Sequence, residues 1–200
     1  MFKVLLKLKI IIIFIVAPVI AYAAEPELVL QSGHTVAGEI RSVKFHPEGN
    51  IVASAGGDQT VKLWDLKTGM LLRTLIGHKG MILDISFSST GDTLVSVGMD
   101  RTIRLWNIHT GQEIRKFQDD AFYPSCAAIH PYSRIVFSAG SSGNEGNIKI
   151  WDIVSGKAIF KIRQDAPVKE FCFTKDGKTF ASIGESDKIK LWGIELDKPE

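Results

Sequence analysis

Two stretches of the chain carry the residue types of a hydrolytic site. Each has a His, a Ser and an Asp, with four residues from the Ser to the Asp and six from that Asp to a Trp. The two sets are His34, Ser54, Asp58 and Trp64, and His78, Ser96, Asp100 and Trp106. In a Ser–His–Asp triad the imidazole takes the serine proton and the carboxylate orients the imidazole. Such catalysis needs one exposed nucleophile beside an oxyanion site, so the same set twice, each time with a Trp, indicates a structural unit. We therefore expect no catalytic residues.

The elements that position these sets recur along the chain. The stretch VKLWD at 61–65 returns as IRLWN at 103–107, IKIWD at 148–152 and IKLWG at 189–193. The four tryptophans are 42, 45 and 41 residues apart: Trp64, Trp106, Trp151 and Trp192. Repetition at this period indicates a propeller or a solenoid. Each copy is β-branched and aromatic with large apolar residues on both faces, which predicts a strand packed between two neighbouring sheets.

The second repeat shows the pattern of four strands most clearly. Strands are predicted at 71–75, 82–87, 93–97 and 102–106, separated by turn residues. The Gly-His pair, the middle-strand Ser, the turn Asp and the closing Trp-Asp resemble the WD-repeat family of β-propellers over residues 27–196. The resemblance implies an all-β propeller of four-stranded antiparallel blades, with four repeats in 24–200. It also implies that the two His, Ser, Asp and Trp sets are buried, and that the protein is a non-catalytic scaffold for protein or peptide partners.

The third and fourth repeats depart from this pattern. Both have the middle-strand Ser, but Glu145 and Ser186 stand where the Asp is expected. Asp119-Asp120 and Gln164-Asp165 replace the Gly-His pair. We expect the buried network to be absent or altered in these two repeats, and the two blades to be softer, because an unpaired buried polar group costs roughly 1–3 kcal/mol.

The third repeat also contains three extra residues between its Ser and its Trp, within 141–147. Insertions in repeats often lie on a binding face, so this stretch is predicted to be a loop that projects from one rim. The candidate partner-binding residues are Ser141, Ser142, Asn144, Glu145 and Asn147, with Gly57 and Met99 in turns on the same rim. The alternative is a solvated turn without a function. A calcium site is disfavoured because Glu145 is the one charged residue there.

The strand count leaves three arrangements open. Residues 25–31 are predicted to be an outermost strand without a blade of its own, whereas the fourth repeat ends without one. Pairing of these two would close a ring of four blades and remove the exposed sheet edges. The other arrangements are an open half-ring that forms a homodimer and one part of a longer product, since propellers have roughly four to eight blades.

Residues 1–23 have the composition of a signal peptide of bacterial type. Three lysines in the first nine residues precede an apolar run at 10–16 and an A-x-A motif at 21–23, so the mature chain is predicted to begin at Ala24. The alternative is an uncleaved membrane anchor, but that needs about 20 apolar residues, whereas residues 10–24 are only 15 and include Pro18. We expect a periplasmic or secreted protein without stable membrane insertion.

Charge and histidine spacing weigh against other ligands. Without residues 1–23 the chain has 21 basic and 22 acidic residues, a formal charge of −1, which gives no electrostatic case for nucleic acid. The histidines show no paired spacing, so no metal or cofactor is expected, and His46 and His130, each before a Pro, are interpreted as turn residues. A cation stands two residues before each Trp, and we expect these side chains to hold their charges in water: Lys62, Arg104, Lys149 and Lys190.

Two further expectations concern the first strands of the repeats. Cys126 and Cys172 have the same parity in successive repeats and are predicted to be free, buried thiols. Asp84 and Lys44 are the candidates for a second hypothesis, in which the chain is a ligand-binding or hydrolytic envelope domain that uses the central channel. A third hypothesis is that the chain is the regulatory part of a longer envelope enzyme.

Overall fold

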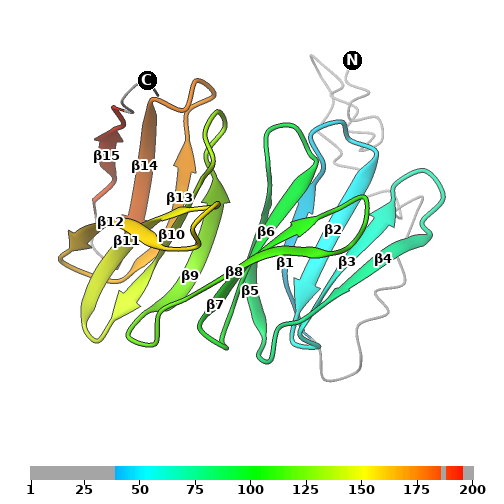
Figure 1. Ribbon diagram of the computed structural model, residues 1–200, viewed down its shortest axis with the longest axis horizontal. Helices are drawn as coiled ribbons and strands as arrows, with labels where there is room; N and C mark the ends of the chain where they lie inside the picture. The colour runs from blue at the N-terminus through cyan, green and yellow to red at the C-terminus, as the bar shows by residue number, and fades with distance from the viewer. Residues whose placement is uncertain (1–38, 186–187, 196–200) are drawn as a thin grey trace, which may run out of the picture. The chain divides into compact units, whose positions relative to one another are not determined.

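The computed structural model describes residues 39–185 and 188–195. Within these ranges the secondary structure is entirely β, in four antiparallel sheets that follow the chain order (Figure 1). The first sheet holds β1 (Ile40–Phe45), β2 (Ile51–Gly56), β3 (Thr60–Asp65) and β4 (Leu71–Ile76). The second holds β5 (Ile82–Phe87), β6 (Thr93–Gly98), β7 (Thr102–Asn107) and β8 (Glu113–Gln118). The third holds β9 (Tyr123–Ile129), β10 (Ile135–Ser142), β11 (Glu145–Asp152) and β12 (Ala158–Gln164). The fourth holds β13 (Val168–Phe173), β14 (Thr179–Gly184) and β15 (Lys190–Gly193).

These sheets are the blades that the sequence predicts, and we number them one to four. The four strands expected in the second repeat are confirmed, each to within a residue or two of the predicted bounds. The fourth blade has three strands among the described residues. The predicted strand at 25–31 and the predicted signal at 1–23 lie outside these residues. The first strands of successive blades contact one another in the order β1, β5, β9 and β13.

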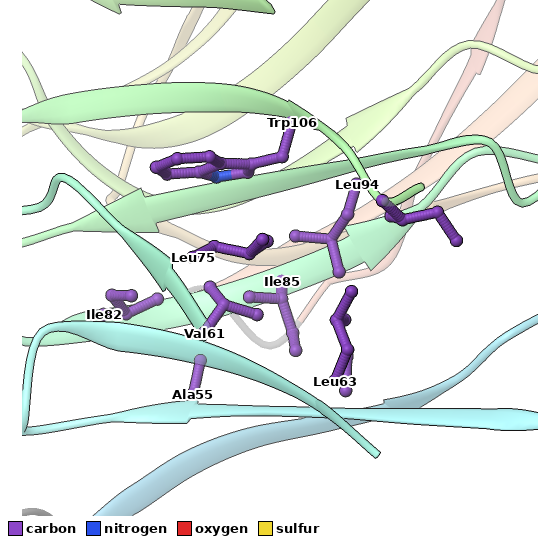
Figure 2. Packing of buried hydrophobic residues seen from close by; sticks show 10 residues of the cluster. Ala55, Val61, Leu63, Leu75, Ile82, Ile85, Leu94 and Trp106 are labelled. Atoms are coloured by element: carbon purple, nitrogen blue, oxygen red, sulfur yellow. The ribbon is translucent and has the colours of Figure 1, made fainter. Parts of the chain in front are cut away.

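The hydrophobic core lies between successive blades. Figure 2 shows the first seam, where Val61 and Leu63 of blade one face Ile85 and Leu94 of blade two. Equivalent clusters fill the seams between blades two and three and between blades three and four. In β7 Trp106 packs in the first seam and Leu105 in the second, because successive side chains of a strand point to opposite faces. The prediction of a strand packed between two neighbouring sheets is therefore confirmed for β7.

Two histidines join the turns of neighbouring blades. His46 and His130 are buried, and His130 Nε2 lies 3.0 Å from the carbonyl oxygen of Gly177 in the next-blade turn. His46 takes the matching place beside Gly91, where an added Cβ would lie 2.0 Å from its Nε2. Gly91 also has a φ of +85°, a conformation that glycine adopts without steric cost. These histidines are therefore more than turn residues, because each one packs one blade against the next.

Arginine side chains join the outer strands across two seams. Arg73 on β4 donates from Nε to the carbonyl oxygen of Ile108, and Arg115 on β8 donates in the same way to Ile153, both at 3.1 Å. Strand pairing puts Phe160 of β12 at the equivalent position in blade three. A cavity of about 530 Å³, lined by Phe160, lies at this third seam, compared with about 250 Å³ at the first. The third seam is therefore less completely filled.

The two outward faces of the described blades are not covered by another described sheet. Phe45 on blade one and Leu191 on blade four are both exposed. The strand at 25–31 that a closed ring of four blades needs lies outside the described residues. Both cysteines are free as predicted, but Cys172 is exposed and the prediction that it is buried is wrong. It lies on the outward face of blade four, whereas Cys126 is covered at the seam with blade four.

Candidate functional site

The second blade contains the complete hydrogen-bonded set that the resemblance implies. His78 lies with Nδ1 3.0 Å from the Asp100 carboxylate and with Nε2 2.8 Å from the Ser96 hydroxyl. Trp106 donates its indole N–H to the same hydroxyl oxygen at 2.8 Å. A carboxylate can only accept, so the neutral imidazole carries its proton on Nδ1 and accepts the serine proton at Nε2. Every polar group of the set is satisfied within the blade.

Asp100 is held as a carboxylate by its surroundings. Burial by itself would raise the pKa of Asp100, but hydrogen bonds from His78, from the backbone N–H of Lys79 and from Thr102 lower it well below the usual range. Ser96 is almost fully buried between Trp106 and His78. A substrate cannot reach its hydroxyl without opening the blade, so the arrangement is that of a structural set.

The first blade has the same anchor but its set is only partly described. Trp64 donates to Ser54 at 2.9 Å, and Asp58 accepts from Lys62 and Thr60 at 2.8 and 2.9 Å. His34, the predicted fourth member, lies outside the described residues.

The third and fourth blades retain the Trp–Ser bond and change the charged partners, which confirms the prediction of an altered network. Trp151 donates to Ser138 at 2.8 Å, and Trp192 donates to Ser182 at 2.9 Å. In blade three, Lys149 bonds Asp119 from the segment before β9, and its ammonium lies 4.6 Å over the ring of Phe122. In blade four an exposed pair takes this place, with Lys190 3.0 Å from Asp165.

The expectation that the four cations hold their charges in water is wrong for three of them. Lys62, Arg104 and Lys149 are buried, and each one forms an ion pair with an acidic residue. The cation two residues before the Trp thus needs a carboxylate nearby, because an unpaired buried charge is strongly unfavourable. Lys190 is the one that remains partly in water.

The extra residues of blade three extend a hairpin instead of forming a loose loop. Ser141 pairs with Gly146 and Ser142 with Glu145, and the turn is made by Gly143 and Asn144. Asn144 and Glu145 are exposed and Ser141 and Ser142 partly so, but Asn147 is completely buried and cannot bind a partner. The prediction of a projecting loop is therefore corrected to the tip of a paired hairpin.

Further exposed residues belong to this rim, of which the sequence predicted Met99 and missed Tyr123 and Arg101. Tyr123, opposite Ser141 in the sheet, is 49% exposed, and Met99 in the β6–β7 turn is 63% exposed. The guanidinium of Arg101 lies 4.3 Å over the ring of Tyr123 and donates to the backbone oxygen of Asp120. Gly57, in the matching turn of blade one, is only partly exposed.

We call this surface the rim patch and define it by its residues: Met99, Arg101, Tyr123, Ser142, Asn144 and Glu145. Arg101 has a φ of +62°, a conformation uncommon for residues other than glycine, and Gln59 repeats it in blade one with 67°.

Comparison with known proteins follows the same repeats. The family described as "WD domain, G-beta repeat" matches residues 25–65, 69–107 and 111–152, which is more than half of the chain. The chain belongs to the WD-repeat family. The fourth repeat lies beyond the matched residues, yet its Trp192–Ser182 bond and its three strands give it the construction of a WD-repeat blade.

Several WD-repeat proteins are similar in sequence. Nuclear distribution protein PAC1 of Arthroderma benhamiae is 32% identical over 170 residues, which covers 80% of this chain and 37% of that protein. The PAC1 protein of Arthroderma otae is 31% identical over the same length. WD repeat domain-containing protein 83 of Homo sapiens is 45% identical over 47 residues, 24% of this chain. The chain thus spans little more than a third of the length of its PAC1 relatives.

The inner strands of this WD-repeat protein bring together the residues of the second hypothesis. Asp84 accepts from Ser42 at 3.0 Å, and Lys44 lies 3.9 Å away. Burial raises the pKa of Asp84, with the charge of Lys44 and the Ser42 hydrogen bond acting against it. Burial, helped by the charge of Asp84, raises the pKa of the Cys126 thiol to about 12, so this thiol is protonated near neutral pH and is a poor nucleophile.

Two further features of the described residues bear on metal and membrane binding. Among residues 39–185 and 188–195, no group of three or more His, Cys, Asp or Glu is placed to hold a metal ion. The same part of the chain contains no helix of the length and hydropathy needed to cross a bilayer.

Proposed function

We propose that this WD-repeat protein is an exported, non-catalytic binding platform, and that the rim patch is its contact surface for a protein or peptide partner. WD-repeat proteins in general act as scaffolds for protein interaction. The observation that carries the proposal is the placement of Arg101 over Tyr123, with exposed Met99 in the same β6–β7 turn as Arg101. Arg, Tyr and Met are residue types enriched at protein interfaces, where Tyr and Arg often dominate the binding energy.

The side chains of the patch are held by contacts to the backbone and to one another, which favours binding with little loss of conformational entropy. Arg101 is tied to the backbone of Asp120, and Tyr123 stands in the sheet opposite Ser141. Asn144 and Glu145 at the hairpin tip add hydrogen-bonding groups at the edge of an aromatic centre. An apolar and aromatic centre with polar groups around it is the usual anatomy of a protein–protein interface.

The absence of catalysis is part of the proposal. Ser96 and His78 have the residue types of a hydrolase, but they are buried and bonded to Trp106. The thiol of Cys126 is buried and protonated at neutral pH. The formal charge of −1 after residue 23 supports a protein partner over nucleic acid.

The proposed export rests on residues 1–23 alone. Their basic start, apolar run and A-x-A motif fit a cleavable signal. The PAC1 and WD repeat domain-containing protein 83 relatives come from eukaryotes, so a bacterial type of export stays a proposal. The intact mass of the protein recovered from its host, expected to begin at Ala24, tests it. A mass that retains Met1 would support the membrane-anchored alternative.

The binding proposal is tested with two substitutions in the rim patch and one matched control. Crosslinking in cells, followed by capture of the tagged protein, would be compared for wild type, Tyr123→Ala, Arg101→Glu and Tyr132→Ala. Tyr132 is also an exposed tyrosine, but it lies in the turn between β9 and β10, at the other end of these strands. We expect a stoichiometric partner with wild type and with Tyr132→Ala, and at least about tenfold less with either patch variant. Equal capture with all four proteins would reject the rim patch.

The channel hypothesis has one specific observation in its favour, the buried Asp84 with its raised pKa beside Lys44. Perturbed carboxylates in clefts are candidates for functional sites. The chain also spans only 37% of its PAC1 relatives, which is compatible with a regulatory part of a longer protein. A ligand screen by thermal shift, in which Asp84→Asn abolishes the shift and Tyr123→Ala does not, would favour this second function.

A further inference from the structure

The outward face of blade four is built like the faces that the other blades bury. Strand pairing puts Ile189 and Leu191 at the positions of Val61 and Leu63 in blade one. Val61 and Leu63 are 0% and 1% exposed at the first seam, whereas Ile189 and Leu191 are 72% and 74% exposed. Their equivalents in blade two are buried as well. We call this surface the trailing face and define it by Ile183, Ile189, Leu191 and Cys172.

The outward face of blade one has the opposite character. Ile40, Val43 and Phe45 occupy the positions that Ile82, Ile85 and Phe87 use to pack against the preceding blade. Val43 and Phe45 are 51% and 64% exposed, but Ile85 is fully buried at the first seam. In blade four, Val168 and Phe171 occupy the same positions and are buried against blade three. We call the surface formed by Ile40, Val43 and Phe45 the leading face.

We propose that a second copy of this chain covers both faces, with the trailing face of each copy packed on the leading face of the other. The seams inside one copy are the argument for this occupant, because a trailing face meets a leading face three times along the chain. The two uncovered surfaces are one of each kind, so two copies satisfy both of them with two identical interfaces. Such an assembly is closed and two-fold symmetric. It has eight blades, within the roughly four to eight found in propellers.

The same geometry supplies an internal reporter. Cys172 belongs to the trailing face and is exposed in the single copy, while Cys126 is buried in its own seam. Burial of Cys172 at the interface between copies slows its reaction with a thiol reagent, and Cys126 reacts slowly in either state. The labelling rate of Cys172 is therefore expected to fall when the protein concentration is raised above the dissociation constant of the dimer.

The test measures the mass of the full chain by sedimentation velocity over a range of concentrations, for wild type and three variants. Leu191→Asp places a charge in the trailing face, Phe45→Asp places one in the leading face, and Val154→Asp is the control at an exposed apolar residue in the β11–β12 turn. We expect twice the mass of one chain for wild type and control. Each of the other variants should dissociate roughly 30-fold or more readily, since a charge in a buried apolar contact is poorly tolerated.

Mixing the two interface variants tests the head-to-tail pairing itself. Leu191→Asp copies keep an intact leading face and Phe45→Asp copies keep an intact trailing face, so the equimolar mixture forms one wild-type interface. We expect dimers with one copy of each variant in the mixture, with Cys172 of the Phe45→Asp copy protected from labelling. Far-ultraviolet circular dichroism identifies any variant that fails to fold, and the labelling of wild-type Cys172 then still decides. A wild-type chain of single mass with concentration-independent labelling would overturn the proposal, and so would a mixture that stays monomeric.

Discussion

The second and third blades contain the same Trp–Ser hydrogen bond but balance their buried cation in different ways. In blade two, Arg104 pairs with Glu113 on β8 at 2.5 Å and lies 3.9 Å from Asp100, which bonds His78 from the β6–β7 turn. In blade three, Asp119 on the other connecting segment bonds Lys149. Each blade thus has a cation two residues before the Trp, and its carboxylate partner can come from a turn, from the next strand or from the segment between blades. The histidine is needed only where the serine hydroxyl has to be linked to a carboxylate on the turn.

The largest expected effect separates the tryptophans of blades two and four. Trp106 is almost fully buried at the first seam, whereas Trp192 is partly exposed on a blade that has three described strands. We expect Trp106→Ala to lower the free energy of unfolding by about 3–5 kcal/mol, and Trp192→Ala by roughly half as much. Urea denaturation followed by circular dichroism measures both values. Equal losses would mean that the seams, and not the individual blades, set the stability.

A smaller effect distinguishes the two carboxylates. Asp100→Asn weakens hydrogen bonds to His78, Lys79 and Thr102, and should cost about 2–3 kcal/mol because buried charge-assisted bonds are lost. Asp119→Asn removes the partner of one lysine at a site where about a third of the Asp119 side chain is exposed, so solvent screening limits the cost to about 1 kcal/mol. Urea denaturation followed by circular dichroism measures both losses. A larger loss from Asp119→Asn would show that blade three depends on its ion pair as strongly as blade two depends on its histidine.

The contribution of Asp100 to the free energy of unfolding should be lost in acid. Its pKa is lowered on folding, so its contribution is complete above the unfolded value of about 4 and is lost as the pH falls toward the folded value. The stability difference between wild type and Asp100→Asn is therefore expected to be constant from pH 5 to 7 and to shrink below about pH 4. Asp84→Asn is the control of opposite sign, because burial raises the pKa of Asp84 and wild type gains on this variant as the pH falls. If the stability difference from wild type changed with pH in the same direction for both variants, the opposite pKa shifts of Asp100 and Asp84 would be contradicted.

Hydrogen exchange extends the comparison to whole blades. Asn147 Oδ1 and Gln164 Nε2 of blade three are buried without a hydrogen-bond partner among the described residues, and blade four has three strands there. The amides of β10 and β14 are therefore expected to exchange faster than those of β6, by about 1–2 kcal/mol in opening free energy. Equal protection across β6, β10 and β14 would refute the prediction that blades three and four are softer.

The sequence was sufficient for the features that repeat and insufficient for those that occur once. The Trp spacing predicted the blades, and the sets of the first two repeats predicted hydrogen bonding between Ser and Trp, which all four blades contain. The contact of Arg101 with Tyr123 joins two blades and has no counterpart in the motif, so no repeat pattern pointed to it. The burial of Asn147 was missed because an insertion can extend a hairpin as readily as it can form a loop. Exposure of Cys172 depends on which blade comes next, and strand parity carries no information about that.

The smallest expected effect on stability tests whether the third seam can be strengthened by an arginine like those of the first two seams. Arg73 and Arg115 each donate across a seam to the carbonyl oxygen of the residue two positions after the Trp of the next blade. Phe160 occupies the equivalent position in blade three. Phe160→Arg can donate to the corresponding carbonyl of Ile194, and we expect the free energy of unfolding to rise by about 0.5–1 kcal/mol. Phe160→Lys is the matched control, since it brings the charge without the planar guanidinium that bonds from a fixed Nε. Thermal denaturation should show a higher Tm for the arginine variant alone. An equal gain with lysine would attribute the effect to charge, and a loss with both would show that the aromatic ring already seals this seam.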